Sequence, residues 1–301
     1  MDCAVQLTGS ICALATPFAA DGALDLEAFA RLIDHQLAGG TQGLVVAGST
    51  GEAHMLEAEE WEQLLDFAVR YTQGRVPVLA GTGQAATAAT IRRTRRARAM
   101  GADAALVVTP YYVRPTQEGL LRHFTEVAEQ GDLPIVLYNV PSRTACDLQP
   151  ETAARLAQHD RIIGLKEARS DAPRLAAAAS LSRPGFAVYS GDDATAHAAM
   201  LAGMQGVISV VNNLVPAAVR QLADRCIAGD RAGAETQAAR LAPLLGALDC
   251  APNPVPVKAG LAALGIARST VRLPLTELAP GEARKRLETT LAALFPMDGT
   301  A

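Results

Sequence analysis

Lysine is rare in this chain, and one of its few lysines stands where chemistry is the best reason for it. Of the 27 lysine and arginine residues, only Lys166, Lys258 and Lys285 are lysines. Lys166 ends an apolar run, where a buried cation costs roughly several kcal/mol unless it is paired or neutralised. An unprotonated lysine amine attacks a carbonyl to form a Schiff base, and a guanidinium cannot. The alternative is a strand-end lysine that reaches solvent or pairs with Glu167.

Two further groups could serve such a lysine. The turn Gly48-Ser49-Thr50-Gly51 follows another apolar run, and its N–H groups and hydroxyls could hold an anion such as the carboxylate of a 2-oxo acid. A plain glycine-rich turn with Ser/Thr capping is the alternative. Tyr138 ends a further run, where a buried phenol can accept and donate a proton. Its alternative is a packed aromatic ring whose hydroxyl is satisfied.

Three more motifs could bind a ligand or a metal ion. Arg143 lies in a loop and could bind a second carboxylate through both guanidinium nitrogens, although an isolated loop arginine is more often a surface residue. For Asp192-Asp193 helix capping is favoured over metal binding, because no histidine or third acid is nearby. Residues 81–86 fit a dinucleotide-binding pattern, but this signal is weak because Asp103 precedes its strand instead of ending it. No metal and no cofactor are therefore expected.

Eight short apolar runs must position these groups. Each run is followed by an Ala/Leu-rich segment of helical periodicity, and the starts are about 20 to 33 residues apart, the period of one β/α unit. The sequence thus predicts an α/β fold, a (β/α)8 TIM barrel, in which the carboxyl ends of the strands carry the catalytic groups. The predicted strands are residues 11–15, 43–47, 76–80, 104–108, 134–138, 162–166, 186–190 and 206–210.

The chain after residue 210 has a different pattern, with helices predicted at 216–228, 230–248 and 281–294 and no strand between them. We expect a barrel domain at residues 1–225 and a C-terminal helical extension at 226–301. A net charge of -4 with 50% hydrophobic residues gives no reason to expect nucleic acid or a membrane as a partner. The arginine-rich segment 92–98 is interpreted as a solvated helix face. Five scattered cysteines and no basic leader or long apolar run suggest a reducing cytoplasm.

Taken together, these residues resemble the dihydrodipicolinate synthase / N-acetylneuraminate lyase family over nearly the full length. The matching blocks are Thr8-Gly9-Ser10, Thr16-Pro17, Gly48-Ser49-Thr50-Gly51-Glu52, Ala80-Gly81-Thr82-Gly83, Val108-Thr109-Pro110-Tyr111-Tyr112, Leu137-Tyr138-Asn139-Val140-Pro141-Ser142-Arg143-Thr144, Gly164-Leu165-Lys166-Glu167-Ala168, Ser190-Gly191-Asp192-Asp193, Gly206-Val207-Ile208-Ser209-Val210 and Pro252-Asn253-Pro254.

The resemblance implies a role for each matching position. Lys166 would form the Schiff base with pyruvate, and Tyr138 would donate and accept its protons. Ser49 and Thr50 would hold the pyruvate carboxylate, with Ser49 also in a proton relay. Tyr112 would extend the relay into a neighbouring subunit, which implies a tight dimer, usually paired into a homotetramer. The carbonyl groups of Gly191 and Ile208 would line the pocket.

The second substrate separates the members of this family. Arg143 after Tyr138-Asn139-Val140-Pro141 matches the synthases, in which this arginine binds the carboxylate of aspartate 4-semialdehyde on the route to lysine. Ser49 departs from the threonine more common in synthases. The serine keeps the hydroxyl but loses the methyl group that restricts its rotamer. One alternative is an aldolase of the same fold acting on a sugar acid or another 2-oxo acid. A noncatalytic binding module that keeps the barrel is the other, and trapping of a pyruvate adduct with borohydride would exclude it.

The resemblance also concerns regulation by lysine. Lysine-inhibited members bind the effector at the tight-dimer interface, at positions matching His54, Ala58, Trp61, Ala85, Ala89 and Tyr111. The tyrosine is kept here. Alanine replaces the asparagine and glutamate of sensitive bacterial members at positions 85 and 89, so the effector's ammonium groups would lack partners. We therefore expect only a remnant of the effector site.

Overall fold

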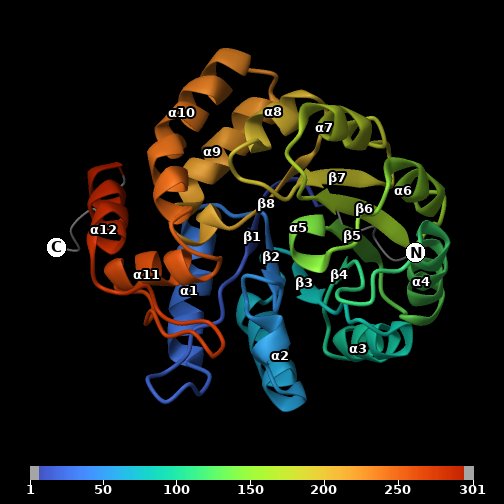
Figure 1. The fold of residues 1–301 in the computed structure, drawn as a ribbon, viewed down its shortest axis with the longest axis horizontal. Coiled ribbons are helices and arrows are strands. Elements are labelled where there is room, and N and C mark those ends of the chain that lie inside the picture. Colours follow the sequence, from blue (N-terminus) through green and yellow to red (C-terminus); the bar gives the residue numbers. More distant parts are fainter. Residues whose placement is uncertain (1–6, 295–301) are drawn as a thin grey trace.

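The computed structural model describes residues 7–294, in which eight parallel strands close into a barrel in sequence order (Figure 1). The last strand pairs with the first, with Gly206 opposite Gly9. This confirms the predicted (β/α)8 barrel. The strands are β1 Gly9–Ala13, β2 Gly43–Val46, β3 Val78–Gly81, β4 Ala104–Val108, β5 Ile135–Asn139, β6 Ile162–Glu167, β7 Ala187–Ser190 and β8 Gly206–Ser209.

The strands are apolar without a break because both of their faces are buried. Side chains that alternate along each strand fill either the barrel interior or the layer between strands and helices. On β1, for example, Ile11 and Ala13 pack inside the barrel, whereas Cys12 belongs to the outer layer. This packing fixes the register, and with it the polar residues at the carboxyl ends of the strands.

Helices surround the barrel and connect its strands (Figure 1). Two short 3-10 helices, η1 Ala53–Met55 and η2 Val211–Asn213, follow β2 and β8. The α-helices up to the end of the ring are α1 Leu26–Ala38, α2 Ala58–Thr72, α3 Thr87–Ala99, α4 Gln117–Gln130, α5 Pro141–Thr144, α6 Pro150–Leu156, α7 Ala172–Ala179, α8 Ala196–Leu201 and α9 Pro216–Ile227.

Three more helices form the C-terminal extension, α10 Arg231–Leu248, α11 Val255–Ala263 and α12 Glu282–Leu294 (Figure 1). The boundary expected near residue 225 falls in the last turn of α9. Residues 295–301 of the expected extension lie outside the described residues. The sequence did not predict α11. Its first seven residues are all buried, so it lacks the one-sided apolar pattern by which a surface helix is recognised.

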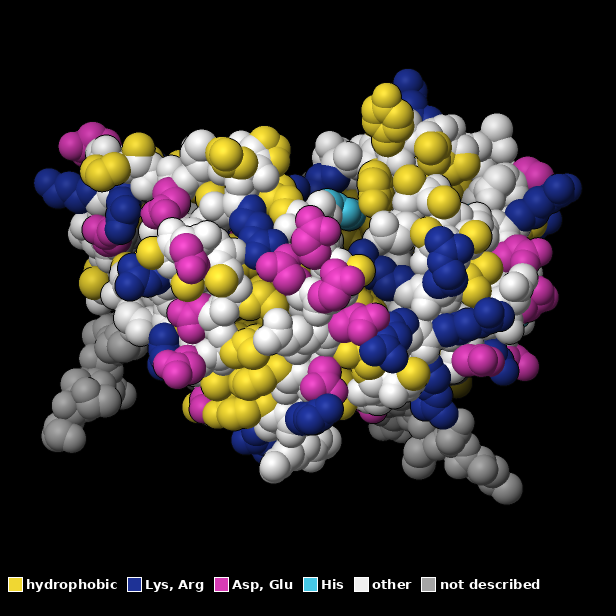
Figure 2. Space-filling model, turned by 90° about the horizontal axis from the view of Figure 1, so that it is seen from below, with side chains coloured by type: hydrophobic (Ala, Val, Ile, Leu, Met, Phe, Trp, Pro, Cys, Tyr) yellow, Lys and Arg dark blue, Asp and Glu magenta, His cyan; other side chains and the backbone are white. Residues whose placement is uncertain are grey.

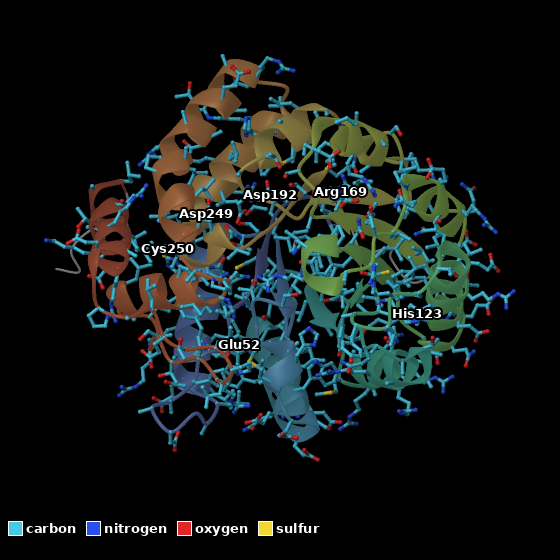
Figure 3. The ribbon with its side chains drawn as sticks, in the orientation of Figure 1. Glu52, His123, Arg169, Asp192, Asp249 and Cys250 are labelled. Atoms are coloured by element: carbon cyan, nitrogen blue, oxygen red, sulfur yellow. The ribbon has the colours of Figure 1, made fainter. Side chains whose placement is uncertain are left out.

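A buried ion pair ties the extension to the loop after β2. Lys258 on α11 places its Nζ 2.5 Å from Oε1 of Glu52, and both side chains are fully buried. The backbone N–H of Arg272 donates to Oε2 of Glu52 at 3.0 Å. The ring of Phe18 lies against both cations, 4.2 Å from Nζ of Lys258 and 4.3 Å from Cζ of Arg272. Glu52 (Figure 3) thus joins the barrel loop to two parts of the extension.

The arginine-rich segment lies on α3 and is largely exposed. Arg96 pairs with Glu62 at 2.6 Å, and Nε of Arg95 donates to the carbonyl of Gln130 at 2.6 Å. These contacts agree with a solvated helix face. Figure 2 likewise shows basic and acidic side chains interspersed over the visible face. Within residues 7–294 no helix is both long and apolar enough to cross a membrane.

The buried ion pair predicts an asymmetric effect on stability. Lys258→Met leaves the carboxylate of Glu52 buried without its cation, and we expect the free energy of unfolding to fall by about 3 to 5 kcal/mol. Glu52→Gln combined with Lys258→Met removes the stranded charge and should recover most of this loss. Chemical denaturation of both variants checks the expectation. Equal destabilisation of the single and the double variant would contradict it.

Candidate active site

A cavity of about 290 Å³ opens at the carboxyl ends of the strands. The barrel contributes one wall and the extension the other. Asp192 after β7 and Asp249 at the end of α10 both line it and lie near each other in Figure 3. Six of the predicted site residues line this single cavity: Ser49, Thr50, Tyr138, Arg143, Lys166 and Gly191.

Lys166 is buried in the wall of the cavity with a relative exposure of 4%. Strand pairing places Tyr138 of β5 opposite Lys166 of β6, and Nζ lies 4.4 Å from the centre of the tyrosine ring. Among residues 7–294 no carboxylate forms an ion pair with this amine. The amine is therefore not held in a structural ion pair and is available to react at the cavity surface.

Glu167 does not pair with Lys166, because consecutive strand residues point to opposite faces. Its carboxylate accepts from Nδ2 of Asn139 at 3.0 Å and from the backbone N–H of Arg169 at 2.8 Å. Burial raises the pKa of this carboxyl, and these hydrogen bonds and Arg174 oppose the rise. The interpretation of Lys166 as half of a Lys166–Glu167 pair is therefore wrong.

Gly191 gives the lysine stem its space. A Cβ at this position would lie 3.0 Å from Cε of Lys166 and 2.9 Å from Cβ of Ala168. Few real Cβ atoms come so close to a neighbour, so a side chain here would press the lysine out of place. The position after β7 thus needs glycine for packing beside the amine.

The turn after β2 has the features of an anion-binding nest. Thr50 is 3% exposed, and both Thr50 and Ser49 line the cavity. Among the residues described, the backbone N–H groups of Ser49 and Thr50 have no hydrogen-bond acceptor. The turn is closed by the N–H of Gly51, which donates to the carbonyl of Gly48 at 3.1 Å. The turn therefore offers two backbone N–H groups and two hydroxyls beside the cavity, the kind of donors that a carboxylate requires.

Arg143 stands at the mouth of the cavity on the short helix α5. Its side chain is exposed, and one guanidinium nitrogen donates to the backbone carbonyl of Asn253 at 3.1 Å. Asn253 lies between α10 and α11 and lines the same cavity. No role was predicted for this asparagine from the sequence. Its position between two prolines within a matching block was the only signal for it.

Comparison with known proteins assigns this arrangement to a family. The model of the dihydrodipicolinate synthetase family matches residues 6–294. The chain belongs to the dihydrodipicolinate synthetase family. It is 55% identical over 274 residues to the 4-hydroxy-tetrahydrodipicolinate synthase of Xanthomonas axonopodis pv. citri (strain 306), covering 91% of this chain and 90% of the relative. The corresponding enzyme of Stenotrophomonas maltophilia (strain K279a) is 52% identical over 292 residues, 96% of this chain and 98% of the relative.

Solved structures agree with this family assignment. The chloride-inhibited dihydrodipicolinate synthase from Acinetobacter baumannii, complexed with pyruvate, superposes with a TM-score of 0.93 at 42% identity, covering 96% of this chain and 99% of the other. The dihydrodipicolinate synthase from Thermotoga maritima gives a TM-score of 0.93 at 38% identity, covering 95% of this chain and 98% of the other.

Two residues expected to match this family's site lie away from the cavity lining. Tyr112 follows β4 with a positive φ of 71°, is 91% exposed and does not line this chain's own cavity. Ile208 on β8 is fully buried, with its side chain packed inside the barrel. The expectation for Ile208 concerns its backbone carbonyl.

The paired aspartates act on the backbone. Oδ2 of Asp193 accepts the N–H groups of Val210 and Val211, both at 2.9 Å, and so caps η2. Burial raises the pKa of this carboxyl, opposed by its hydrogen bonds. Asp192 accepts from the backbone N–H of Thr195 at 3.0 Å. In the described part of the chain, no three His, Cys, Asp or Glu side chains are grouped as metal ligands.

The glycines of residues 81–86 serve close backbone packing. A Cβ on Gly81 would lie 2.0 Å from the carbonyl oxygen of Ala47, and one on Gly83 would lie 2.6 Å from the backbone nitrogen of Val108. Both glycines let neighbouring loops of the barrel mouth approach each other. This accounts for the dinucleotide-like pattern without any nucleotide.

The packing around Gly191 predicts that a single methyl group impairs the site. Gly191→Ala should displace the Lys166 amine and lower kcat/KM for condensation by about tenfold or more. Gly246→Ala on α10 is the matched control, since its Cβ would meet only ordinary contacts. Steady-state kinetics and thermal melting of both variants decide the matter. Full activity of Gly191→Ala would show that the position of the Lys166 amine does not depend on the absence of a side chain at residue 191.

Proposed function

We propose that this protein condenses pyruvate with L-aspartate 4-semialdehyde to give 4-hydroxy-tetrahydrodipicolinate in the biosynthesis of diaminopimelate and lysine. The observation that carries the proposal is a buried lysine amine that lines the cavity and forms no ion pair with any described residue, in a chain more than half identical to proteins with this activity. A lysine in this state is suited to nucleophilic catalysis.

The first half-reaction takes place on Lys166. Its neutral amine attacks C2 of pyruvate to give a carbinolamine, which loses water to form the Schiff base. Tyr138, whose ring lies against the amine, donates and accepts the protons of these steps. Ser49 extends the proton relay from Tyr138, and Tyr112 of a neighbouring subunit continues it. The 91% exposure of Tyr112 agrees with insertion into another chain.

The turn after β2 binds the pyruvate carboxylate. The hydroxyls of Ser49 and Thr50 and their free N–H groups donate to its oxygens. The carbonyl groups of Gly191 and Ile208 line the pocket. Loss of a proton from the pyruvate methyl group then gives an enamine, because the electron pair of the C–H bond moves into the protonated Schiff base on Lys166.

The second half-reaction uses the aldehyde. The enamine carbon attacks the aldehyde carbon of aspartate semialdehyde, whose oxygen takes a proton to become the 4-hydroxyl group. The substrate's amine then attacks the Schiff-base carbon, the ring closes, and Lys166 leaves as the free amine. Arg143 at the mouth holds the carboxylate of this substrate in bidentate fashion.

We further place the active protein in the cytoplasm as a homotetramer, a dimer of tight dimers, built from a barrel domain at 1–225 and a helical domain at 226–301. The exposed Tyr112 and Val113 after β4 support a subunit contact there. One solved relative is described as the first monomeric dihydrodipicolinate synthase variant. The four cysteines of the described residues are free thiols, which suits a reducing compartment.

The proposed function is tested by a coupled assay for the condensation product. Pyruvate with aspartate semialdehyde should give turnover, and sugar-acid aldehydes or other 2-oxo acids should give little. Preference for a sugar-acid substrate would establish the aldolase alternative. Absence of turnover with every aldehyde, together with no pyruvate adduct, would leave a binding module.

Lys166→Arg should keep the fold and abolish turnover. The substitution retains a basic side chain but removes the nucleophile, so kcat should fall at least about a thousandfold. Lys285→Arg, which changes an exposed lysine of α12, should leave kcat unchanged. The coupled assay and thermal melting check both. Residual activity of Lys166→Arg near the wild-type level would rule out the Schiff-base mechanism at this residue.

Arg143→Ala should separate the two substrates. Schiff-base formation with pyruvate should be preserved, while kcat/KM for aspartate semialdehyde falls more than about tenfold through loss of a charge-assisted contact. Arg169→Ala, which removes a guanidinium paired with Asp147 and Asp171, is the control. An unchanged kcat/KM for the aldehyde would favour the aldolase alternative.

Lysine should not inhibit this enzyme at millimolar concentration. Around the position expected for the effector, the ring of His54 lies 4.6 Å from that of Tyr111, and the guanidinium of Arg93 lies 4.5 Å from the ring of Trp61. Burial lowers the pKa of His54, and Arg93 and Arg143 add to this effect. A cationic effector would lie close to the guanidinium of Arg93 beside Trp61 and would find Ala89 in place of the glutamate of sensitive members.

A lysine titration of the coupled assay measures this insensitivity. Half-inhibition below about 1 mM, equivalent to roughly -4 kcal/mol of binding, would show that the altered residues still form an effector site.

A further inference from the structure

Asn253 contacts both halves of the substrate site although it lies outside the barrel. Its Nδ2 donates to Oγ1 of Thr50 at 3.0 Å, and its backbone carbonyl accepts from Arg143 at 3.1 Å. Within residues 7–294 its Oδ1 is buried and has no hydrogen-bond partner. One residue of the extension therefore touches the turn after β2 with its side chain and the arginine at the mouth with its backbone.

The direction of the bond to Thr50 has a chemical consequence. A hydroxyl has one proton to donate and two lone pairs. Because Asn253 donates to a lone pair of Thr50, the hydroxyl proton is left available to another acceptor. A carboxylate accepts hydrogen bonds only, so it needs that proton to point toward it. Had an acceptor stood in place of the amide N–H, the hydroxyl proton would have been drawn away from the cavity.

The segment that carries Asn253 is held firmly against this turn. Lys258, five residues further along, forms the buried ion pair with Glu52, two residues after Thr50. The segment is thus attached twice, by Asn253 to Thr50 and by Lys258 to Glu52. Such double attachment keeps the amide within hydrogen-bond distance of the hydroxyl, which a single exposed contact does not ensure.

We propose that Asn253 is a positioning residue. It orients the hydroxyl of Thr50 so that this hydroxyl donates a hydrogen bond to the pyruvate carboxylate. The inference rests on the proposed function, since it assumes that pyruvate binds in the turn after β2. Asn253 acts on pyruvate through Thr50 and takes no part in bond making. Its backbone carbonyl, which meets Arg143, is common to all side chains at this position.

Two substitutions with opposite hydrogen-bonding character test the proposal. Asn253→Ala removes the donor and should raise KM for pyruvate about threefold to tenfold, the effect of one hydrogen bond. Asn253→Asp is nearly the same size but only accepts, so it should attract the proton of Thr50 and repel the substrate carboxylate. We expect a KM for pyruvate at least tenfold above that of Asn253→Ala. KM for the aldehyde should change less than twofold in Asn253→Ala, which keeps the backbone carbonyl that accepts from Arg143.

A double-mutant cycle asks whether the effect passes through Thr50. Thr50→Val removes the hydroxyl and keeps the shape, and adding Asn253→Ala to it should change KM for pyruvate less than twofold. This cycle needs only the alanine and valine variants, so it decides the matter even where Asn253→Asp does not fold. Additive effects in the cycle, or Asn253→Asp binding pyruvate as well as Asn253→Ala, would overturn the inference.

The proposed function can fail separately from this inference. If wild-type protein gives no adduct with pyruvate and borohydride, the function itself is wrong. If the wild type forms the adduct, and the concentration of pyruvate needed for half-maximal trapping is the same in wild type and Asn253→Ala, then only the role of Asn253 is wrong.

Discussion

The site depends on a buried lysine amine that has no counter-ion among residues 7–294, and a second buried lysine in this chain allows a direct comparison. Lys166 and Lys258 are both buried. Lys258 meets the carboxylate of Glu52 at 2.5 Å and acts as a structural cation. Within residues 7–294 no carboxylate pairs with Lys166, whose Nζ lies over the face of the Tyr138 ring. The neighbouring carboxylate of Glu167 is bound by Asn139 and the backbone of Arg169 instead. Burial of a lysine is thus compatible with opposite roles, and the position of the nearest carboxylate decides between them.

The C-terminal extension completes a site that the barrel alone leaves open. Parallel strands bring Tyr138 and Lys166 side by side and place the turn after β2 on the same rim. The extension supplies the opposite wall, with α10 and Asn253 lining the cavity. The buried pair between Glu52 and Lys258 holds these two parts together. The residues at this junction therefore contribute both to the stability of the fold and to substrate binding.

Much of this arrangement could be predicted from the sequence, because a barrel follows from local patterns. All eight predicted strands overlap the observed ones, since strands buried on both faces stand out as apolar runs. Their order then placed Tyr138 beside Lys166. By contrast, α11 was missed because a helix buried on nearly every side lacks amphipathic periodicity. The contact of Asn253 with Thr50 joins residues about 200 positions apart. No local sequence pattern predicts a contact over such a separation.

The central claim is that Lys166, and neither of the other lysines, forms a covalent bond to pyruvate. Incubation with pyruvate and borohydride converts a Schiff base into a stable secondary amine, and peptide mapping by mass spectrometry locates it. We predict one adduct per chain, on the peptide that contains Lys166, and none with Lys166→Arg. An adduct on Lys258 or Lys285, or no adduct at all, would contradict it.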